Sequence, residues 1–140
     1  MINLRQADVH DEVFLFDLKN EEEMRKYSIV THDKIKWEDH IKWCEANLQY
    51  VYIAELDGEK CGDIRVKDGE VAIKVHPDFR GKGVAYQMLS YATEKFETLT
   101  ARIVDGNVPS MRLFIKCGFQ VVDHKDNYYI LKHENTSDRT

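Results

Sequence analysis

The sequence predicts an α+β domain with a mostly antiparallel sheet, and three observations lead to this fold class. Alternating apolar residues mark short strands, and apolar residues at helical spacing mark longer helices. The elements follow one another in the order β-α-α-β-β-β-α-β-α-β-β. The chain has 140 residues, of which 43% are hydrophobic, and this suffices for one domain with a buried core.

The N-terminal third is predicted to contain one strand and two helices. The strand begins at Ile2, and Asp8 can cap a helix that runs to about Asn20. Residues 24–34 lack periodicity and are expected to form a loop before a second helix over 36–48. The apolar stripe of the second helix would be Trp37, Ile41, Cys44 and Leu48, with His40, Trp43 and Asn47 on the neighbouring face.

Turn signals divide the rest of the chain. Asp57-Gly58 and Lys67-Asp68-Gly69 separate three strands, which therefore form an antiparallel meander. These strands cover 50–56, 61–66 and 71–75. They are followed by a helix up to Phe96, a strand at 101–104, a helix from Asn107 to Cys117, and strands at 119–122 and 128–132. The domain is expected to span residues 1–133, and residues 134–140 are expected to form a polar tail.

A glycine-rich loop joins the strand at 71–75 to the following helix. It reads Arg80-Gly81-Lys82-Gly83-Val84-Ala85. The first backbone N–H groups of a helix have no partner within it, and the helix dipole favours an anion at that end. Gly81 and Gly83 would let a ligand approach the backbone, while Arg80 and Lys82 add positive charge. These features predict a site for a pyrophosphate group.

Two common phosphate-binding loops do not match this segment. A Walker loop requires Lys after its last glycine, but Gly83 is followed by Val84. A dinucleotide fingerprint requires a third glycine where this chain has Tyr86. The spacing R-x-x-G-x-A instead resembles the acetyl-CoA loop of the GNAT N-acetyltransferases. A second motif of that family, N-x-x-S-x-x-L-[YF]-x-x-x-G-F, is matched by Asn107, Ser110, Leu113, Phe114, Gly118 and Phe119.

The resemblance covers essentially the whole chain and implies the GNAT fold, a mixed, mostly antiparallel sheet flanked by helices. In that fold the strand at 71–75 and the strand at 101–104 splay apart. Acetyl-CoA would bind there, with its pantetheine arm paired to the backbone of Ile73 and Val75, and a main-chain N–H could polarise the thioester. The other implied cofactor contacts are Arg80, Gly81, Lys82, Gly83, Val84, Ala85, Asn107, Ser110 and Phe114.

Amine acetylation needs a base, because an ammonium group is not a nucleophile. Glu70 lies near the position of a catalytic glutamate in some relatives, although a carboxylate at a strand edge can equally be solvated. His76 closes the same strand and could transfer a proton, or it could have a structural role beside the cofactor. Phe114 stands where relatives often carry a tyrosine acid, so the departing thiolate is expected to leave without that acid.

Residues 17–28, 37–43 and 125–132 resemble one subgroup of the family, which acetylates the 4-amino group of nucleotide-linked deoxyaminosugars, as in the pseudaminic acid pathway. Lys19, which replaces an arginine of that subgroup, or Arg25 could hold the diphosphate. The other candidate substrate contacts are Asn20, His40, Trp43 and Tyr128. Alternatively, His40 could be an interior or surface histidine with its hydrogen bonds satisfied within the protein, and the rings of Trp43 and Tyr128 could simply pack in the core.

Two other functions remain open at this stage. One is acetylation of a protein or peptide N-terminus, a lysine or another small amine. The other is a CoA-binding module without turnover, which Phe114 and the uncertain base would suit. The sequence does not decide among these acceptors.

Composition restricts the remaining partners. The chain has 20 Lys and Arg against 25 Asp and Glu, a net charge of -5 and a pI near 5.7, which argues against nucleic acid. No apolar run approaches the ~20 residues of a membrane span. The odd, scattered cysteines are typical of reduced thiols in a cytoplasmic protein, and the histidines lack metal-ligand spacing, so no metal is expected. The protein is expected to be a monomer or a homodimer.

Overall fold

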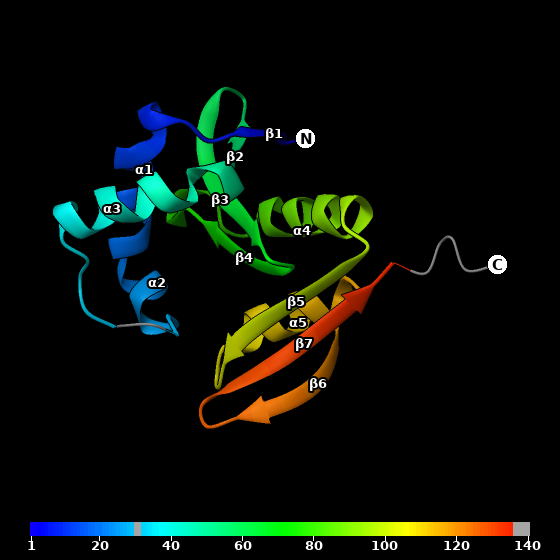
Figure 1. Ribbon diagram of the computed structural model, residues 1–140. Coiled ribbons are helices and arrows are strands. Elements are labelled where there is room, and N and C mark those ends of the chain that lie inside the picture. The colour runs from blue at the N-terminus through cyan, green and yellow to red at the C-terminus, as the bar shows by residue number, and fades with distance from the viewer. Residues whose placement is uncertain (30–31, 136–140) are drawn as a thin grey trace.

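Seven strands form one mixed sheet in the computed structural model, which describes residues 1–29 and 32–135 (Figure 1). The strand order is β1-β2-β3-β4-β5-β7-β6, and every neighbouring pair is antiparallel except β4 and β5. The strands are β1 (Asn3–Gln6), β2 (Val51–Leu56), β3 (Glu59–Lys67), β4 (Glu70–Val75), β5 (Thr98–Val104), β6 (Gln120–Lys125) and β7 (Tyr128–Glu134). This arrangement confirms the predicted fold class.

Helices cover both faces of the central strands. They are α1 (Glu12–Asn20), α2 (Glu22–Lys26), α3 (Trp37–Asn47), α4 (Val84–Lys95) and α5 (Val108–Lys116). On one face, α4 and α5 contribute Met88 and Phe114 to the larger core cluster. On the other face, Leu15 of α1 packs with Val51 and Ile53 of β2 in a smaller cluster. The sheet is therefore the middle layer of three in this part of the molecule.

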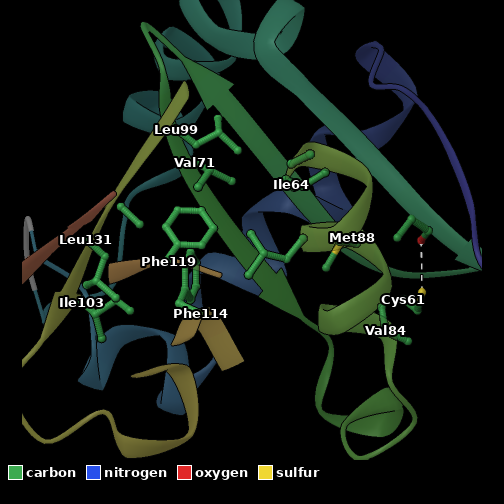
Figure 2. Packing of buried hydrophobic residues seen from close by; sticks show 14 residues of the cluster. Cys61, Ile64, Val71, Val84, Met88, Leu99, Ile103, Phe114, Phe119 and Leu131 are labelled. Atoms are coloured by element: carbon green, nitrogen blue, oxygen red, sulfur yellow. Dashed lines mark hydrogen bonds between the residues drawn. The ribbon is translucent and has the colours of Figure 1, made fainter. Parts of the chain in front are cut away.

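The larger core joins the two halves of the sheet. Phe114 of α5 and Phe119 lie close to Val71 of β4 and Leu131 of β7 (Figure 2). The two phenylalanine rings meet edge to face, with centroids 4.9 Å apart. Because this cluster crosses from β4 to β7, side-chain packing holds the halves together where strand pairing is weak.

The weak point is the pair β4 and β5. Their register contains a single partner pair, Glu70 and Thr100, and the Thr100 N–H also donates to the Gly69 carbonyl at 2.8 Å. Beyond that pair the parallel strands separate, which confirms the expected splay. Arg102 of β5 closes the narrow end, because its guanidinium donates two hydrogen bonds, of 2.7 and 2.9 Å, to the Glu70 carboxylate.

The N-terminal helices differ from the prediction. The expected helix from Asp8 divides into a short 3₁₀ turn, Val9–Asp11, and α1, and the Asp8 carboxylate accepts a hydrogen bond from the His10 N–H as expected of a cap. The loop predicted from residue 24 is wrong at its start, because α2 occupies Glu22–Lys26. This helix is too short to show periodicity, but acidic residues begin it and basic residues end it, which suits its dipole. Residues 30–31 of the predicted loop lie outside the described residues.

The buried face of α3 agrees with the prediction only in part. Cys44 is buried and Leu48 packs against the smaller core cluster, as expected. Trp37 of the same stripe is 40% exposed, whereas His40 and Asn47 of the neighbouring face are buried. The buried ring of His40 is stabilised by hydrogen bonds as well as by contacts with the rings of Phe16, Trp37 and Trp43. Apolar periodicity therefore placed Cys44 and Leu48 correctly but missed the buried polar residues His40 and Asn47.

Two further positions define the central and last strands. Gly62 of β3 lies opposite Val75, and a Cβ atom added to it would meet the Lys74 carbonyl oxygen at 2.4 Å. No side chain fits there without moving β3 away from β4. At the C-terminus, β7 continues to Glu134 and the Asn135 N–H donates to the Glu97 carbonyl, so the expected tail begins inside the sheet. Its residues 136–140 lie outside the described residues.

Candidate functional site

A cavity of about 1050 Å³ opens along the splay between β4 and β5. One end, here called the loop end, is lined by residues 79–81 and 83–86 at the start of α4. The middle is lined by β4, by residues 102–104 of β5 and by the first half of α5. The other end, here called the helical end, is lined by residues of α1, α2 and α3, by residues 33–36, and by Arg65 and Lys74 of the sheet.

The loop end has the geometry of an anion site. Gly81 and Gly83 both have φ +78°, a conformation that L side chains rarely adopt. Gly83 is the N-cap residue of α4 and provides no side-chain cap, and the first hydrogen bond of the helix runs from the Gln87 N–H to the Gly83 carbonyl. The N–H groups of the first turn therefore face the cavity end without helical acceptors. Arg80 lines this end, whereas Lys82 does not.

The middle of the cavity places the second motif beside the free edge of β4. Ile73 and Val75 line it, and β4 has no strand partner on its β5 side beyond Glu70. Asn107 caps α5 by accepting a hydrogen bond from the Ser110 N–H, and both residues line the cavity. The ring of Phe114 also reaches the cavity wall but is only 3% exposed.

The structure separates the two candidate bases. Glu70 lines the cavity at the closed end of the splay, where both of its oxygens accept hydrogen bonds from Arg102. His76 does not line it; the His76 Nδ1 atom accepts a hydrogen bond from the Asp78 N–H and caps the 3₁₀ turn Pro77–Phe79. Only Glu70 is thus positioned to meet a substrate in this cavity.

Lys19, His40 and Trp43 come together at the helical end. The Nζ atom of Lys19 lies 3.0 Å from the centroid of the Trp43 ring and 3.4 Å from His40 Nδ1. His40 Nε2 lies 2.7 Å from the main-chain oxygen of Glu12, so this nitrogen carries the proton and Nδ1 accepts from Lys19. Both ring nitrogens of His40 are engaged within the protein, which leaves none for the predicted nucleotide contact.

The other predicted substrate residues have structural partners. The Asn20 side chain accepts from the Ile35 N–H and donates to the Ile35 carbonyl, and it does not line the cavity. Arg25 lines the cavity, but its guanidinium donates to the carbonyls of Asn20 and His32. Tyr128 is not brought to the site: it lies on β7 opposite Val104 and outside the cavity lining. Asn20 and Arg25 therefore hold the wall of the helical end in shape.

Sequence reasoning missed three charged residues of the sheet. Arg65 and Lys74 line the helical end, and Asp63 is buried next to them, directly opposite Lys74 in the register. The turn at 67–69 could have revealed that Asp63 and Lys74 are neighbours. It pairs Lys67 with Glu70, and counting residues outward along both strands from that pair places Asp63 opposite Lys74.

Burial perturbs the protonation of this cluster. Burial, followed by repulsion from Lys74, lowers the pKa of Lys19 to about 7. Burial raises the pKa of Asp63, against the opposing effect of the cations Lys74, Lys19 and Arg65. The helical end therefore contains a lysine that titrates near neutral pH.

A family comparison decides what kind of protein has this site. The model of the acetyltransferase (GNAT) domain matches residues 47–121, more than half of the chain. The chain belongs to the GNAT acetyltransferase family. The protein is accordingly an enzyme that uses acetyl-CoA to acetylate an amine, as the two sequence motifs implied. A comparison with curated proteins gave no significant match.

Solved structures show the same GNAT fold at low sequence identity. A domain from Methanocaldococcus jannaschii DSM 2661 has a TM-score of 0.86 and 20% identity, over 96% of this chain and 98% of that one. Spermidine N-acetyltransferase from Vibrio cholerae, in complex with CoA and spermine, has a TM-score of 0.85 and 14% identity over 96% of both chains. The Salmonella typhimurium protein yncA, with its cofactor acetyl-CoA, has a TM-score of 0.76 and 21% identity, over 99% and 96%.

Two searches of the described residues bear on other partners of this GNAT domain. None of the helices in 1–29 and 32–135 is long and apolar enough to cross a membrane. Within the same ranges, no three His, Cys, Asp or Glu side chains gather in a way that could hold a metal ion.

Proposed function

We propose that this GNAT enzyme transfers the acetyl group of acetyl-CoA to the 4-amino group of a nucleotide-linked deoxyaminosugar. The observation that carries the proposal is the positive charge of the helical end, where Lys19, Arg65 and Lys74 line the cavity. A diphosphate group on the acceptor matches this charge, whereas a polyamine would be repelled by it.

The loop end fits the cofactor. The free N–H groups at the start of α4, and the two glycines that leave the backbone open, suit the pyrophosphate of acetyl-CoA. In this assignment Val84 and Ala85 lie in the first turn, and Ile73 and Val75 pair with the pantetheine arm along the free edge of β4. The cofactor supplies an acetyl group activated as a thioester.

Glu70 is the proposed acceptor of the amine proton. Its carboxylate lies at the closed end of the splay, and Arg102 fixes its orientation through two hydrogen bonds. A carboxylate has about four lone-pair positions, so two remain for the amine or for a bridging water. Phe114 offers no proton, and the departing thiolate is therefore protonated by solvent.

Glu21 is expected to compete with the cofactor for Arg80. The Arg80 guanidinium donates to the Glu21 carboxylate at 2.9 Å, an ion pair that joins the α1–α2 junction to the loop end. In Glu21→Gln the guanidinium is released from its charged partner, and we expect acetyl-CoA to bind about two- to fivefold more tightly. Calorimetric titration with acetyl-CoA measures this change.

A control for this experiment is Glu22→Gln, which removes a charge from an exposed position of the neighbouring helix α2, outside the cavity lining and without an ion pair to Arg80. Equal affinity gains in both variants would mean that general charge, not the ion pair, limits cofactor binding.

A thiol-release assay tests the acceptor. Acetyl-CoA is supplied with UDP-, GDP- and dTDP-linked 4-amino-deoxysugars, with peptides bearing free N-termini, and with spermidine. We expect release with at least one sugar nucleotide to exceed release with spermidine by about 100-fold, because like charges disfavour the polyamine. If CoA thiol is released only when peptides are supplied, the acceptor is a protein or peptide amine and not a sugar nucleotide. No release with any amine would support a CoA-binding module without turnover.

A further inference from the structure

The strand register brings three cations to one face of the sheet. Residues 64, 71 and 73 point into the larger core, so the alternate residues of β3 and β4 point to the opposite face. There Arg65 lies opposite Ala72, and Lys74 lies opposite Asp63. Helices α1 and α3 cover this face and add Lys19 and Trp43, and the Arg65 guanidinium carbon is 5.7 Å from the Trp43 ring centroid.

Negative charge does not balance these cations. Within the ranges 1–29 and 32–135, the side chains of Arg65 and Lys74 make no hydrogen bond and no ion pair within 4.0 Å. Lys19 donates only to a neutral histidine. The nearest carboxylate that acts on all three is Asp63, which is 3% exposed and does not line the cavity.

Uncompensated positive charge at a cavity wall favours the binding of an anion. The three cations repel one another, and within the described residues none has a carboxylate oxygen within 4.0 Å, so an anion that entered between them would be stabilised. Asp63 reduces the repulsion among the three cations. The acidic residues that line the helical end are Glu23, Asp33 and Asp39, and the basic residues there are Lys19, Arg25, Lys34, Lys36, Arg65 and Lys74, so positive charge remains in excess. The aromatic ring of Trp43 adds a flat apolar surface next to Lys19.

We propose that Lys19, Arg65 and Lys74 form a subsite that binds an oxyanion of the acceptor, a phosphate or a carboxylate, and so select anionic amines as substrates. The inference rests on the proposed function, because it places the acceptor at the helical end of the same cavity. It adds the residues that recognise the acceptor and the chemical class of the group that they bind.

Proton uptake should accompany binding at this subsite. The groups that face Lys19 are His40 and Cys44 of α3, Asp63 and Arg65 of β3, and Lys74 of β4. Burial, followed by repulsion from Lys74 and Arg65, lowers the pKa of Lys19 to about 7 against the opposing effect of Cys44 and Asp63, so Lys19 of the free enzyme is partly deprotonated at pH 7.5. An oxyanion raises this pKa and draws a proton onto Lys19. Binding should therefore be tightest below pH 7 and weaken as the pH rises above it, by up to ~10-fold per unit.

Calorimetry on the CoA-saturated enzyme tests the subsite without knowledge of the acceptor. Saturation with CoA fills the loop end, so inorganic pyrophosphate added afterwards can report only on a second anion site. We expect one pyrophosphate per chain and, from titrations at pH 7.5 in two buffers of different ionisation enthalpy, uptake of up to one proton. Succinate is titrated in parallel. If succinate binds more tightly than pyrophosphate, the subsite prefers carboxylates; if pyrophosphate binds more tightly, it prefers phosphates.

Three variants assign the contacts. Lys74→Met and Arg65→Met should each weaken pyrophosphate binding by at least ~10-fold, and Lys74→Arg, which keeps the charge, should largely retain it. Lys19→Met should abolish proton uptake and flatten the pH dependence. Lys42→Met, a matched change at an exposed position of α3, should leave binding unaltered. Thermal unfolding of each variant verifies that the protein is folded.

Failure of this inference differs from failure of the proposed function. If neither anion binds the CoA-loaded enzyme, or if Lys74→Met and Arg65→Met bind like the wild type, the subsite is wrong even when a sugar nucleotide is acetylated. If the subsite binds an anion but no sugar nucleotide reacts, the oxyanion subsite stands and the acceptor is another anionic amine.

Discussion

Replacing Gly83 with aspartate is expected to raise the Michaelis constant for acetyl-CoA by about 100-fold, equivalent to about 2.7 kcal/mol. The substitution puts a carboxylate at the start of α4, where the cofactor's pyrophosphate is proposed to bind. The nearest heavy atom to an added Cβ is Gln87 Nε2 at 4.0 Å, so the side chain has room. Repulsion between charges about 4 Å apart near a protein surface is large enough for this effect.

Gly83→Asn is the matched control for this prediction. Asparagine and aspartate both tolerate the left-handed conformation of Gly83 and both can cap a helix, so the two variants differ mainly in charge. Steady-state kinetics with acetyl-CoA varied at a fixed acceptor concentration gives the comparison. A Michaelis constant for the aspartate variant within about threefold of the asparagine variant would place the pyrophosphate elsewhere.

Asp11→Asn is expected to lower the free energy of unfolding by about 3 kcal/mol. Asp11 is fully buried, its two oxygens accept hydrogen bonds of 2.8 Å from Arg5, and the Nζ atom of Lys60 lies 2.8 Å from Oδ1. The amide cannot replace these contacts. Because Arg5 and Lys60 are about a third exposed, solvent screening keeps the loss at the lower end of the range for buried pairs.

This stability difference should depend on pH in a defined direction. Burial alone would raise the pKa of Asp11, but the hydrogen bonds from Arg5 and Lys60 hold it well below its usual range. A depressed pKa stabilises the fold fully above the pKa of an unfolded aspartate, about 4, and this contribution is lost as the pH falls below that value. Urea unfolding at pH 7 and at pH 3 should show the difference between the wild type and the variant becoming smaller at pH 3 but not vanishing, because the native Asp11 carboxylate is still ionised there.

Asp57→Asn is the control, since Asp57 is an exposed turn residue that makes no ion pair within the described part of the chain. We expect a change within about 0.5 kcal/mol at either pH. A loss at Asp11 no larger than this would mean that the Arg5 and Lys60 contacts contribute little to stability.

The cofactor half of the site could be predicted from the sequence because its chemistry is local. Gly81 and Gly83 adopt the positive φ that the loop requires, and the helix start that they precede supplies the N–H groups. Asn107 caps α5 where the second motif places it. Each of these features depends on a few consecutive residues, so tertiary packing did not alter them.

The acceptor half depends on contacts between distant segments. Arg65 and Lys74 look like solvent-facing residues of alternating strands, and they become a cavity wall only because α1 and α3 cover that face. His40 looked available to a ligand until Glu12 and Lys19 were seen to occupy its nitrogens. Tyr128 resembles a substrate contact by its position in the chain, but its ring lies 5.9 Å from the guanidinium carbon of Arg102 and does not itself line the cavity.

The absence of a side chain at Gly62 restricts how acceptor preference can be redesigned. Since any Cβ there would collide with the Lys74 main chain, altering β3 at this point shifts the strand that carries Lys74. Variants selected for new acceptors should therefore accumulate changes in α2 and residues 33–36, which line the opposite wall and lie outside the sheet. Libraries confined to that wall should yield more folded, active enzymes than libraries that include residues 61–63.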